Sequence, residues 1–239
     1  NNKTRIGGKI DLALIPYEES IDIDTKNDWV ICQSILNRRK IGFVVIGNYD
    51  IGMGHIHRAI TLDNYFSNDE CTFYIKSNSD LGIDKISSLN YKYKIFQSFD
   101  KLVDLLIEDN VDIVINDILD VDCEYMCNLK QEDFFVVNFE NNSRCEQTAD
   151  LSFNALYEFT GNDESYFYGY KYEVLREDIY LFPIKKDFNN ENLVVTISFG
   201  GTDINNASML VLDYLFKFKD NLNKRGFLIE QLGITIKAQ

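Results

Sequence analysis

Short apolar runs alternate with stretches of helical periodicity from residue 41 to residue 154. The runs have the length of strands, and several are continuous enough to be buried on both faces of a sheet. The predicted strands are residues 41–47, 71–76, 91–96, 111–115, 134–138 and 151–154, and the predicted helices are residues 80–89, 100–108, 122–129 and 142–148, besides one that starts near His55. This order predicts an α/β fold, a Rossmann-like parallel sheet with helices on both faces.

The segments on either side of this region predict three parts, residues 1–40, 41–187 and 188–239. A helix is expected at residues 27–37, but the first forty residues contain no further element with which it could form a hydrophobic core. We therefore expect them to be the end of a larger domain. A polar linker at 185–192 precedes a strand at 193–199, a glycine turn and a helix at 206–218. A second Rossmann-type domain needs on the order of 100 residues, so this domain is expected to be truncated.

Charge and composition narrow the class of protein. The net charge of −14 argues against nucleic acid and anionic membranes as partners. No run approaches the roughly 18 apolar residues of a membrane span, and the polar start is no signal peptide, so we expect a cytoplasmic protein. The odd count of five cysteines predicts free thiols. Cys123 and Cys127 are one helical turn apart but lack the further ligands that a metal requires.

Both histidines fall in one glycine-rich run, Ile51-Gly-Met-Gly-His-Ile-His-Arg58, placed between a strand and a helix. Such a turn brings backbone N–H groups and a positive helix end to a phosphate or another anion. In the first helical turn, the same positive end disfavours the imidazolium form of His55, which keeps a neutral ring able to accept a proton. His55 is therefore the predicted general base.

Arg58 lies three residues after His55 and shares its helix face, whereas His57 points elsewhere. Arg58 is therefore predicted to hold an anionic substrate group beside the base. The plainer interpretation is a generic glycine-rich turn with a surface histidine. Polar residues recur after other strands, at Asn116-Asp117, Asn138–Glu140 and Asn154, and ligands bind at such carboxyl ends, which favours a binding cleft.

Four motifs in order resemble the PseG-type UDP-sugar hydrolases of nonulosonic acid biosynthesis, relatives of MurG with a two-domain GT-B fold. The motifs are Ile51-Gly-Met-Gly-His-Ile-His-Arg58, Asp150-Leu-Ser-Phe-Asn-Ala-Leu-Tyr157, Gly169-Tyr-Lys-Tyr-Glu-Val-Leu-Arg176 and Ser198-Phe-Gly-Gly-Thr-Asp203. The resemblance implies release of UDP from a 2,4-diacetamido-2,4,6-trideoxy sugar. It departs from the family at Gly47-Asn-Tyr-Asp50, where an Arg-x-Asp element is usual.

The resemblance also implies a mechanism. The pyrophosphate of the UDP-sugar lies between Gly52-Met53-Gly54 and Gly200-Gly201-Thr202, where two helix ends stabilise the charge on the departing UDP. His55 deprotonates the water that attacks the anomeric carbon. Asn154 and Tyr172 are candidates for sugar contacts, with packing an equally good explanation of both. The scheme requires no cofactor or metal.

The start of the chain carries a second resemblance. Arg5-Ile-Gly-Gly-Lys9 and Glu19-Ser-Ile-Asp-Ile-Asp-Thr-Lys-Asn-Asp-Trp29 resemble the C-terminal end of CMP-sialic acid synthetases. In that family the Asp-x-Asp pair can bind a divalent metal; here we expect Asp22 and Asp24 to cap the following helix instead. The resemblance implies a fused cytidylyltransferase and hydrolase that forms a homodimer through the cytidylyltransferase part.

Two rival functions fit the same residues. A GT-B glycosyltransferase uses the same cleft but replaces water with an acceptor hydroxyl. A module that no longer catalyses would instead hold a neighbouring synthetase domain or a second copy of the chain. Truncation and the altered Gly47–Asp50 element favour the module, whereas the retained His55 favours an enzyme.

Overall fold

The computed structural model describes residues 11–119, 121–141, 143, 145, 148–156, 164–182, 193–194, 197, 199, 203, 205–217, 227–231 and 234–237. The chain divides into two units, residues 1–38 and residues 39–239. Among the described residues, no helix has the length and apolar character needed to cross a membrane.

The first unit contains a short 3-10 helix, η1 (Tyr17–Glu19), and the helix α1 (Lys26–Leu36), which has no buried residue. The residues that cap α1 are Thr25 and Asp28, so the prediction that Asp22 and Asp24 would do so was wrong. Thr25 Oγ1 accepts a hydrogen bond from Asp28 N, and the Asp28 carboxylate accepts one from Thr25 N at 2.7 Å. This reciprocal capping box satisfies two N–H groups at the helix start, which a more distant carboxylate cannot do.

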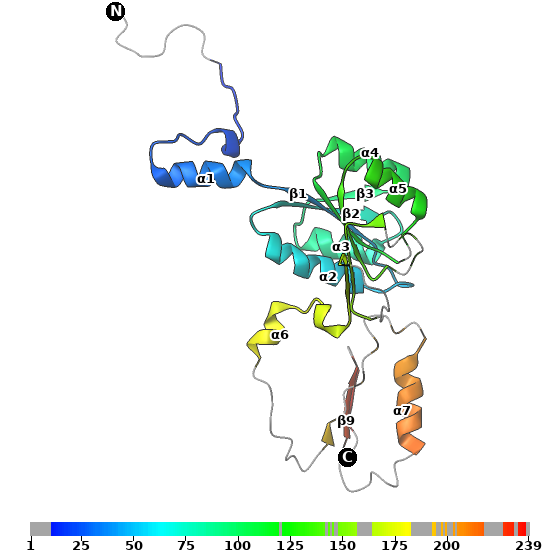
Figure 1. The fold of residues 1–239 in the computed structure, drawn as a ribbon. Helices are drawn as coiled ribbons and strands as arrows, with labels where there is room; N and C mark the ends of the chain where they lie inside the picture. The colour runs from blue at the N-terminus through cyan, green and yellow to red at the C-terminus, as the bar shows by residue number, and fades with distance from the viewer. Residues whose placement is uncertain are drawn as a thin grey trace, which may run out of the picture. The chain divides into compact units, whose positions relative to one another are not determined.

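The second unit is built on a seven-stranded sheet in which every neighbouring pair is parallel, in the order β3-β2-β1-β4-β5-β6-β7 (Figure 1). The strands are β1 (Lys40–Val45), β2 (Glu70–Lys76), β3 (Tyr93–Phe96), β4 (Ile113–Asp117), β5 (Phe135–Phe139), β6 (Leu151–Asn154) and β7 (Tyr166–Tyr168). The connecting helices are α2 (Gly54–Asp63), α3 (Asp80–Ser88), α4 (Phe99–Glu108) and α5 (Cys123–Gln131), and η2 (Asn64–Phe66) extends α2. The predicted Rossmann-like α/β class is confirmed.

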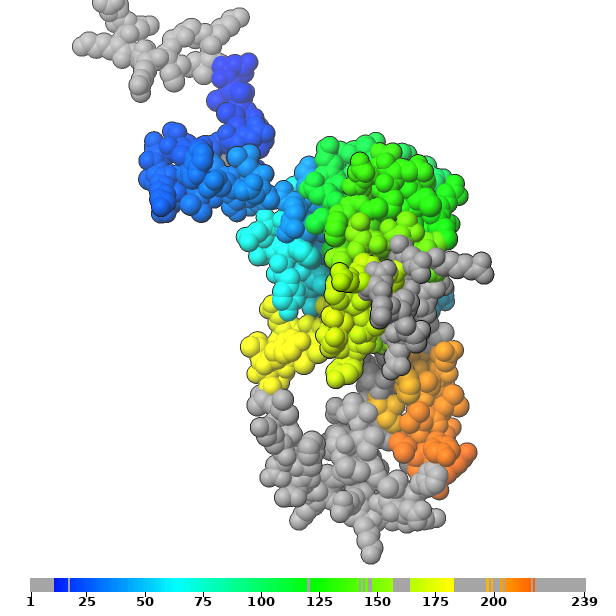
Figure 2. Space-filling model, in the orientation of Figure 1, coloured from blue at the N-terminus to red at the C-terminus, as the bar shows by residue number. Residues whose placement is uncertain are grey.

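Two separate hydrophobic clusters show that helices cover both faces of the sheet. On one face, Leu102 and Leu106 of α4 and Met126 of α5 pack with alternate residues of the central strands. On the other, Ile56 of α2 and Ile86 of α3 do the same. Figure 2 shows α4 and α5 as one continuous green surface. Because both faces are covered, β1 is almost entirely buried, as its uninterrupted apolar run predicts.

The strand order reverses between β1 and β4, since β2 lies on one side of β1 and β4 lies on the other. The chain leaves β1 toward a helix on one face and leaves β4 toward a helix on the opposite face. The two loops therefore diverge and leave a crevice at the carboxyl ends of these strands, which is where open α/β sheets bind ligands. The run that contains His55 follows β1 directly.

Three local expectations need correction. The described residues of 142–148 form no α-helix; Ser143 N bonds to Asn141 Oδ1 and Cys145 N to Ser143 Oγ, so side chains take the place of helical carbonyls. The strand β7 was not expected. Free thiols were expected throughout, yet Cys123 is joined to Cys145 in a disulfide, while Cys32, Cys71 and Cys127 are free.

Three further helical segments and a small sheet follow β7. Residues 170–181 hold η4 (Tyr170–Tyr172) and α6 (Glu177–Leu181), and the helix α7 (Ala207–Lys217) matches the one expected at 206–218. A three-stranded sheet joins β8 (Leu193–Val194), β9 (Phe227–Gln231) and β10 (Ile234–Lys237) in the order β10-β9-β8. The proposed division at residues 187 and 188 stays a prediction.

Gly47 allows α2 and α3 to approach the end of β1, and this contact yields a stability prediction. A Cβ at Gly47 would lie 2.5 Å from Ile56 Cγ1, and the Gly47 carbonyl accepts a hydrogen bond from Gly82 N at 2.9 Å. We expect Gly47→Ala to lower the free energy of unfolding by about 1–3 kcal/mol in urea denaturation, because Ile56 is buried and cannot yield freely. Gly54→Ala, whose Cβ would meet nothing within 4 Å, is the control. Equal stability of the two variants would contradict the prediction.

Candidate functional site

The loop between β1 and α2 is closed by Asn48 and Gly52. Asn48 Oδ1 accepts hydrogen bonds from Asp50 N and Ile51 N, and Gly52 N donates to the Asn48 carbonyl at 2.9 Å. Gly52 has a φ of 90°, a conformation that glycine adopts readily and that side chains disfavour. This tight loop places the start of α2, with Met53 as a cap that offers no side-chain acceptor, beside the crevice. The N–H groups of the first turn are therefore available to an anion.

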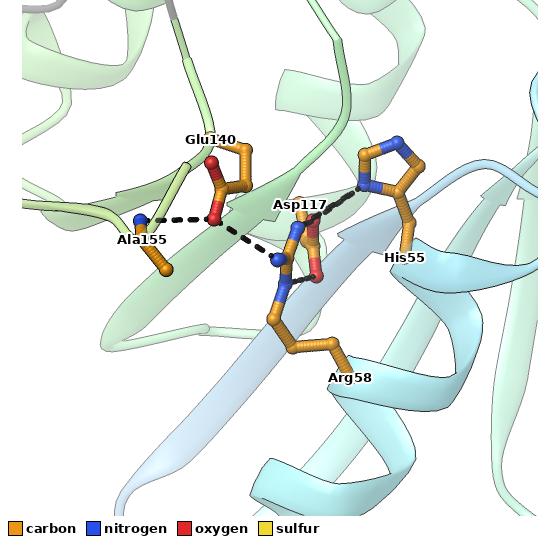
Figure 3. Close-up of polar contacts among 5 residues, drawn as sticks. All are labelled: His55, Arg58, Asp117, Glu140 and Ala155. Atoms are coloured by element: carbon orange, nitrogen blue, oxygen red, sulfur yellow. Dashed lines mark hydrogen bonds and ion pairs between the residues drawn. The ribbon is translucent and has the colours of Figure 1, made fainter. Parts of the chain in front are cut away.

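His55 forms a dyad with Asp117, the last residue of β4. His55 Nδ1 lies 2.6 Å from Asp117 Oδ1, and Asp117 is fully buried while His55 is 8% exposed (Figure 3). A carboxylate can only accept a hydrogen bond, so Nδ1 carries the proton and Nε2 is left as an acceptor. Figure 3 shows Nε2 pointing away from Asp117. The dyad thus fixes the orientation of the imidazole and directs Nε2 away from the carboxylate.

Arg58 also binds Asp117, and it shares the carboxylate oxygen Oδ1 with the histidine. Its Nε donates to Asp117 Oδ2 at 2.7 Å and its Nη2 to Asp117 Oδ1 at 2.6 Å, a two-point pair. Burial alone would lower the pKa of the Arg58 guanidinium, but the hydrogen bonds and charge of Asp117, together with the charges of Glu140 and Glu173, raise it. Arg58 does share a helix face with His55, but these donors go to protein carboxylates and fix Asp117.

Glu140 follows β5 and completes the cluster. Its Oε1 accepts hydrogen bonds from Arg58 Nη1 at 3.3 Å and from Ala155 N at 3.1 Å. The arrangement is a continuous chain from Glu140 through Arg58 and Asp117 to His55 (Figure 3). It joins residues from α2, from the end of β4, and from just beyond the ends of β5 and β6, all at the carboxyl edge of the sheet.

A pocket of about 430 Å³ opens over this cluster, a size within the roughly 300–1,000 Å³ of small-molecule sites. Its lining comes from five parts of the chain: Ile51, Gly54, His55, His57, Arg58 and Thr61; Leu119; Glu140; Leu156; and Glu173, Val174 and Arg176. Partial burial, with the positive charges of Lys85 and Arg176, lowers the pKa of His57, so this second imidazole is neutral near pH 7. His57 and the exposed Arg176 thus offer N–H donors to the pocket.

The structure places the other predicted site residues as follows. Gly52 and Gly54 belong to the β1–α2 turn, and the Met53 side chain packs on the hydrophobic cluster, which leaves its backbone to face a ligand. Asn154 is buried at the end of β6, and Tyr172 packs edge-on against Phe153 and Phe167. Gly200, Gly201 and Thr202 lie outside the described residues. Of the described candidates, Gly54, His55 and Arg58 line the pocket.

Asp117 and Glu140 are the two functional side chains that sequence reasoning missed as such. Both were placed at a carboxyl strand end, but neither was given a partner. The available signal was an acid at each of two buried strand ends, where an apolar or small residue would be expected unless a cation balanced it. Within the part of the chain that the structure describes, no group of three His, Cys, Asp or Glu side chains could hold a metal, and this includes Asp22 and Asp24.

No family model matches the chain. The uncharacterized protein MJ1062 of Methanocaldococcus jannaschii is 29% identical over 202 residues, which are 77% of this chain and 41% of that protein. The chain therefore spans less than half the length of this relative.

Among solved structures, a glycosyltransferase from Rickettsia africae superposes with a TM-score of 0.51 at 10% identity, over 82% of this chain and 68% of that one. MurG from Acinetobacter baumannii gives 0.46 at 8% identity, over 68% of this chain and 52% of that one. A putative UDP-N-acetylglucosamine 2-epimerase from Listeria monocytogenes gives 0.46 at 12% identity, over 80% and 62%. At these identities the likeness concerns the fold alone.

Proposed function

We propose that this chain carries the catalytic base of a UDP-sugar hydrolase that releases UDP from a 2,4-diacetamido-2,4,6-trideoxyhexose in nonulosonic acid biosynthesis. The observation that carries the proposal is the His55–Asp117 dyad, placed at the reversal of strand order and exposed to the pocket. The four motifs that resemble PseG-type hydrolases supply the substrate class. The Rossmann-like fold is compatible with a sugar nucleotide as ligand.

In the proposed reaction, His55 Nε2 takes a proton from water as the water oxygen bonds to the anomeric carbon. The bond from that carbon to the UDP oxygen breaks, and UDP leaves with the electron pair. Asp117 accepts the Nδ1–H hydrogen bond and stabilises the imidazolium that forms. A positioned general base contributes roughly 10²–10⁴-fold to such a step.

Stabilisation of the departing UDP falls to groups other than Arg58, because Asp117 and Glu140 already bind its guanidinium. The N–H groups of the Gly52-Met53-Gly54 turn and the pocket-lining His57 and Arg176 are the candidates. The turn at Gly200–Thr202 remains a proposed second anion site. Residues 1–40 remain a proposed cytidylyltransferase remnant and homodimer contact.

The dyad also supports one rival function, that of a GT-B glycosyltransferase, because a base that activates water can equally activate an acceptor hydroxyl. The test is UDP release from UDP-2,4-diacetamido-2,4,6-trideoxyhexoses by the complete gene product that contains this chain. We expect UDP and free sugar in equal amounts without an acceptor. Release that requires an added acceptor would assign a GT-B transferase, and binding of the sugar nucleotide without release would assign a non-catalytic module.

A further inference from the structure

Glu140 combines a disfavoured backbone conformation with a buried side chain, which is unusual for a residue that only balances the charge of Arg58. Its φ is 51°, in the left-handed region that residues with a Cβ disfavour, and it is 6% exposed. Backbone strain of this kind persists where surrounding contacts enforce it, and it is concentrated at ligand sites. Here the enforcing contacts are the hydrogen bonds from Arg58 and Ala155 to Oε1 and from Glu140 N to the Phe153 carbonyl.

The second carboxylate oxygen, Oε2, is buried and receives no hydrogen bond from the residues that the structure describes. A buried carboxylate oxygen without a donor is unfavourable, so a native structure that keeps one calls for a partner. Glu140 lines the same pocket as His55 and Arg58. A ligand in this pocket is therefore the natural source of the missing donor.

The charge of Glu140 restricts which part of a sugar nucleotide it can contact. A carboxylate repels a pyrophosphate, whereas it binds hydroxyl and amide N–H groups strongly. Glu140 and Asp117 bind the same guanidinium, so the free oxygen lies close to the dyad that must reach the anomeric carbon. The substituent nearest that carbon is the one on the adjacent ring carbon, C2.

We propose that Glu140 Oε2 accepts a hydrogen bond from the C2 substituent of the sugar, either an amide N–H or a hydroxyl. This inference rests on the proposed function, since it assumes a sugar nucleotide in the pocket. Glu140 is then a specificity-determining residue that selects sugars with a donor at C2. The phosphates are then left to the other pocket-lining donors, His57 and Arg176.

The test compares binding of UDP, UDP-2-deoxyglucose, UDP-glucose and UDP-N-acetylglucosamine to the complete gene product by calorimetry. In Glu140→Gln, the amide oxygen must stay on Arg58 and Ala155 N, so its NH₂ group replaces Oε2 and turns an acceptor into a donor. We expect affinity for at least one of the two probes with a C2 donor to fall roughly 10- to 100-fold, as for loss of a charge-assisted hydrogen bond. UDP and UDP-2-deoxyglucose should bind unchanged.

The matched control is Glu132→Gln, the same change at an exposed carboxylate just before β5, which should alter none of the affinities. The probe that loses affinity identifies the donor as amide or hydroxyl. Equal losses for all four probes, or no loss for any, would overturn the inference while leaving the proposed function standing. Failure of the unmodified protein to bind even UDP would instead count against the proposed function.

If Glu140→Gln does not fold, as judged by circular dichroism, the unmodified protein still decides the question. The inference requires that it bind UDP-2-deoxyglucose roughly 10- to 100-fold more weakly than the preferred probe with a C2 donor. Equal affinity for the three sugar nucleotides would overturn it.

Discussion

His55→Asn should lower kcat for UDP release by roughly 10²–10⁴-fold, the usual contribution of a positioned general base. The asparagine amide can still donate a hydrogen bond to Asp117, as His55 Nδ1 does across 2.6 Å, but it has no basic nitrogen in place of Nε2. The variant therefore removes the chemistry while retaining the contact. KM should change little, because the base acts on water rather than on the nucleotide.

A comparison of the two histidines separates this role from a structural one. His57→Asn is the informative comparison, because His57 is the other histidine of the chain and lines the same pocket. It should act mainly on KM. A His55→Asn variant with the kcat of the unmodified protein would remove His55 from the mechanism.

Most of the sheet could be predicted because its central strands are recognisable from their own residues alone. The run from Ile41 to Gly47 is apolar at nearly every position, as expected of a strand covered on both faces. The strands β2, β4 and β5 each contain a shorter apolar run, at residues 73–75, 113–115 and 135–137. The strand β7 is only Tyr166–Tyr168, each half-buried, and three aromatic residues give no periodicity to read. At 142–148 the described residues 143, 145 and 148 are not α-helical for another reason, since side-chain hydrogen bonds to Ser143 N and Cys145 N compete with a helix.

The place of His55 at the carboxyl edge of the sheet was predictable from the sequence, and its partners were not. The position of His55 after a strand and a glycine turn is a local pattern, and it indicates chemistry without knowledge of any other strand. Asp117 meets His55 only because β4 pairs with β1 in the register that sets Val45 beside Asp117. Arg58 was predicted to hold an anionic substrate group, and whether it is free to do so depends likewise on whether a protein carboxylate lies within reach of its guanidinium. Such contacts, at sequence separations of 59 to 82, follow from strand order and register.

Asp117→Asn should have the second large effect, on stability as well as on activity. Asp117 is fully buried and accepts short hydrogen bonds from His55 Nδ1, Arg58 Nε and Arg58 Nη2. Asparagine offers one acceptor oxygen, and its NH₂ group must face another donor. Removing one partner of a buried ion pair costs about 3–5 kcal/mol of unfolding free energy. We expect a loss near the lower end of this range, because Glu140 remains beside Arg58 and still balances part of its charge.

A comparison by urea denaturation makes this prediction specific. Glu70→Gln, which breaks the exposed ion pair with Lys92, should cost no more than about 1 kcal/mol, because solvent screens that pair. The double variant Asp117→Asn with Arg58→Met should lose less unfolding free energy than the sum of the two single losses. The reason is that it contains no buried guanidinium that has lost its main carboxylate. An Asp117→Asn loss below about 1 kcal/mol would contradict the ion-pair role.

Activity adds a second measurement on the same variants. An asparagine at position 117 no longer enforces the Nδ1–H tautomer of His55, and loss of this control in a histidine–carboxylate pair lowers kcat by up to about 10⁴-fold. The Arg58→Met variant keeps Asp117 and its hydrogen bond to His55, so its loss of kcat should be smaller. If both variants lose the same activity, the guanidinium is as necessary as the carboxylate, and the working unit is the three-residue cluster rather than the dyad.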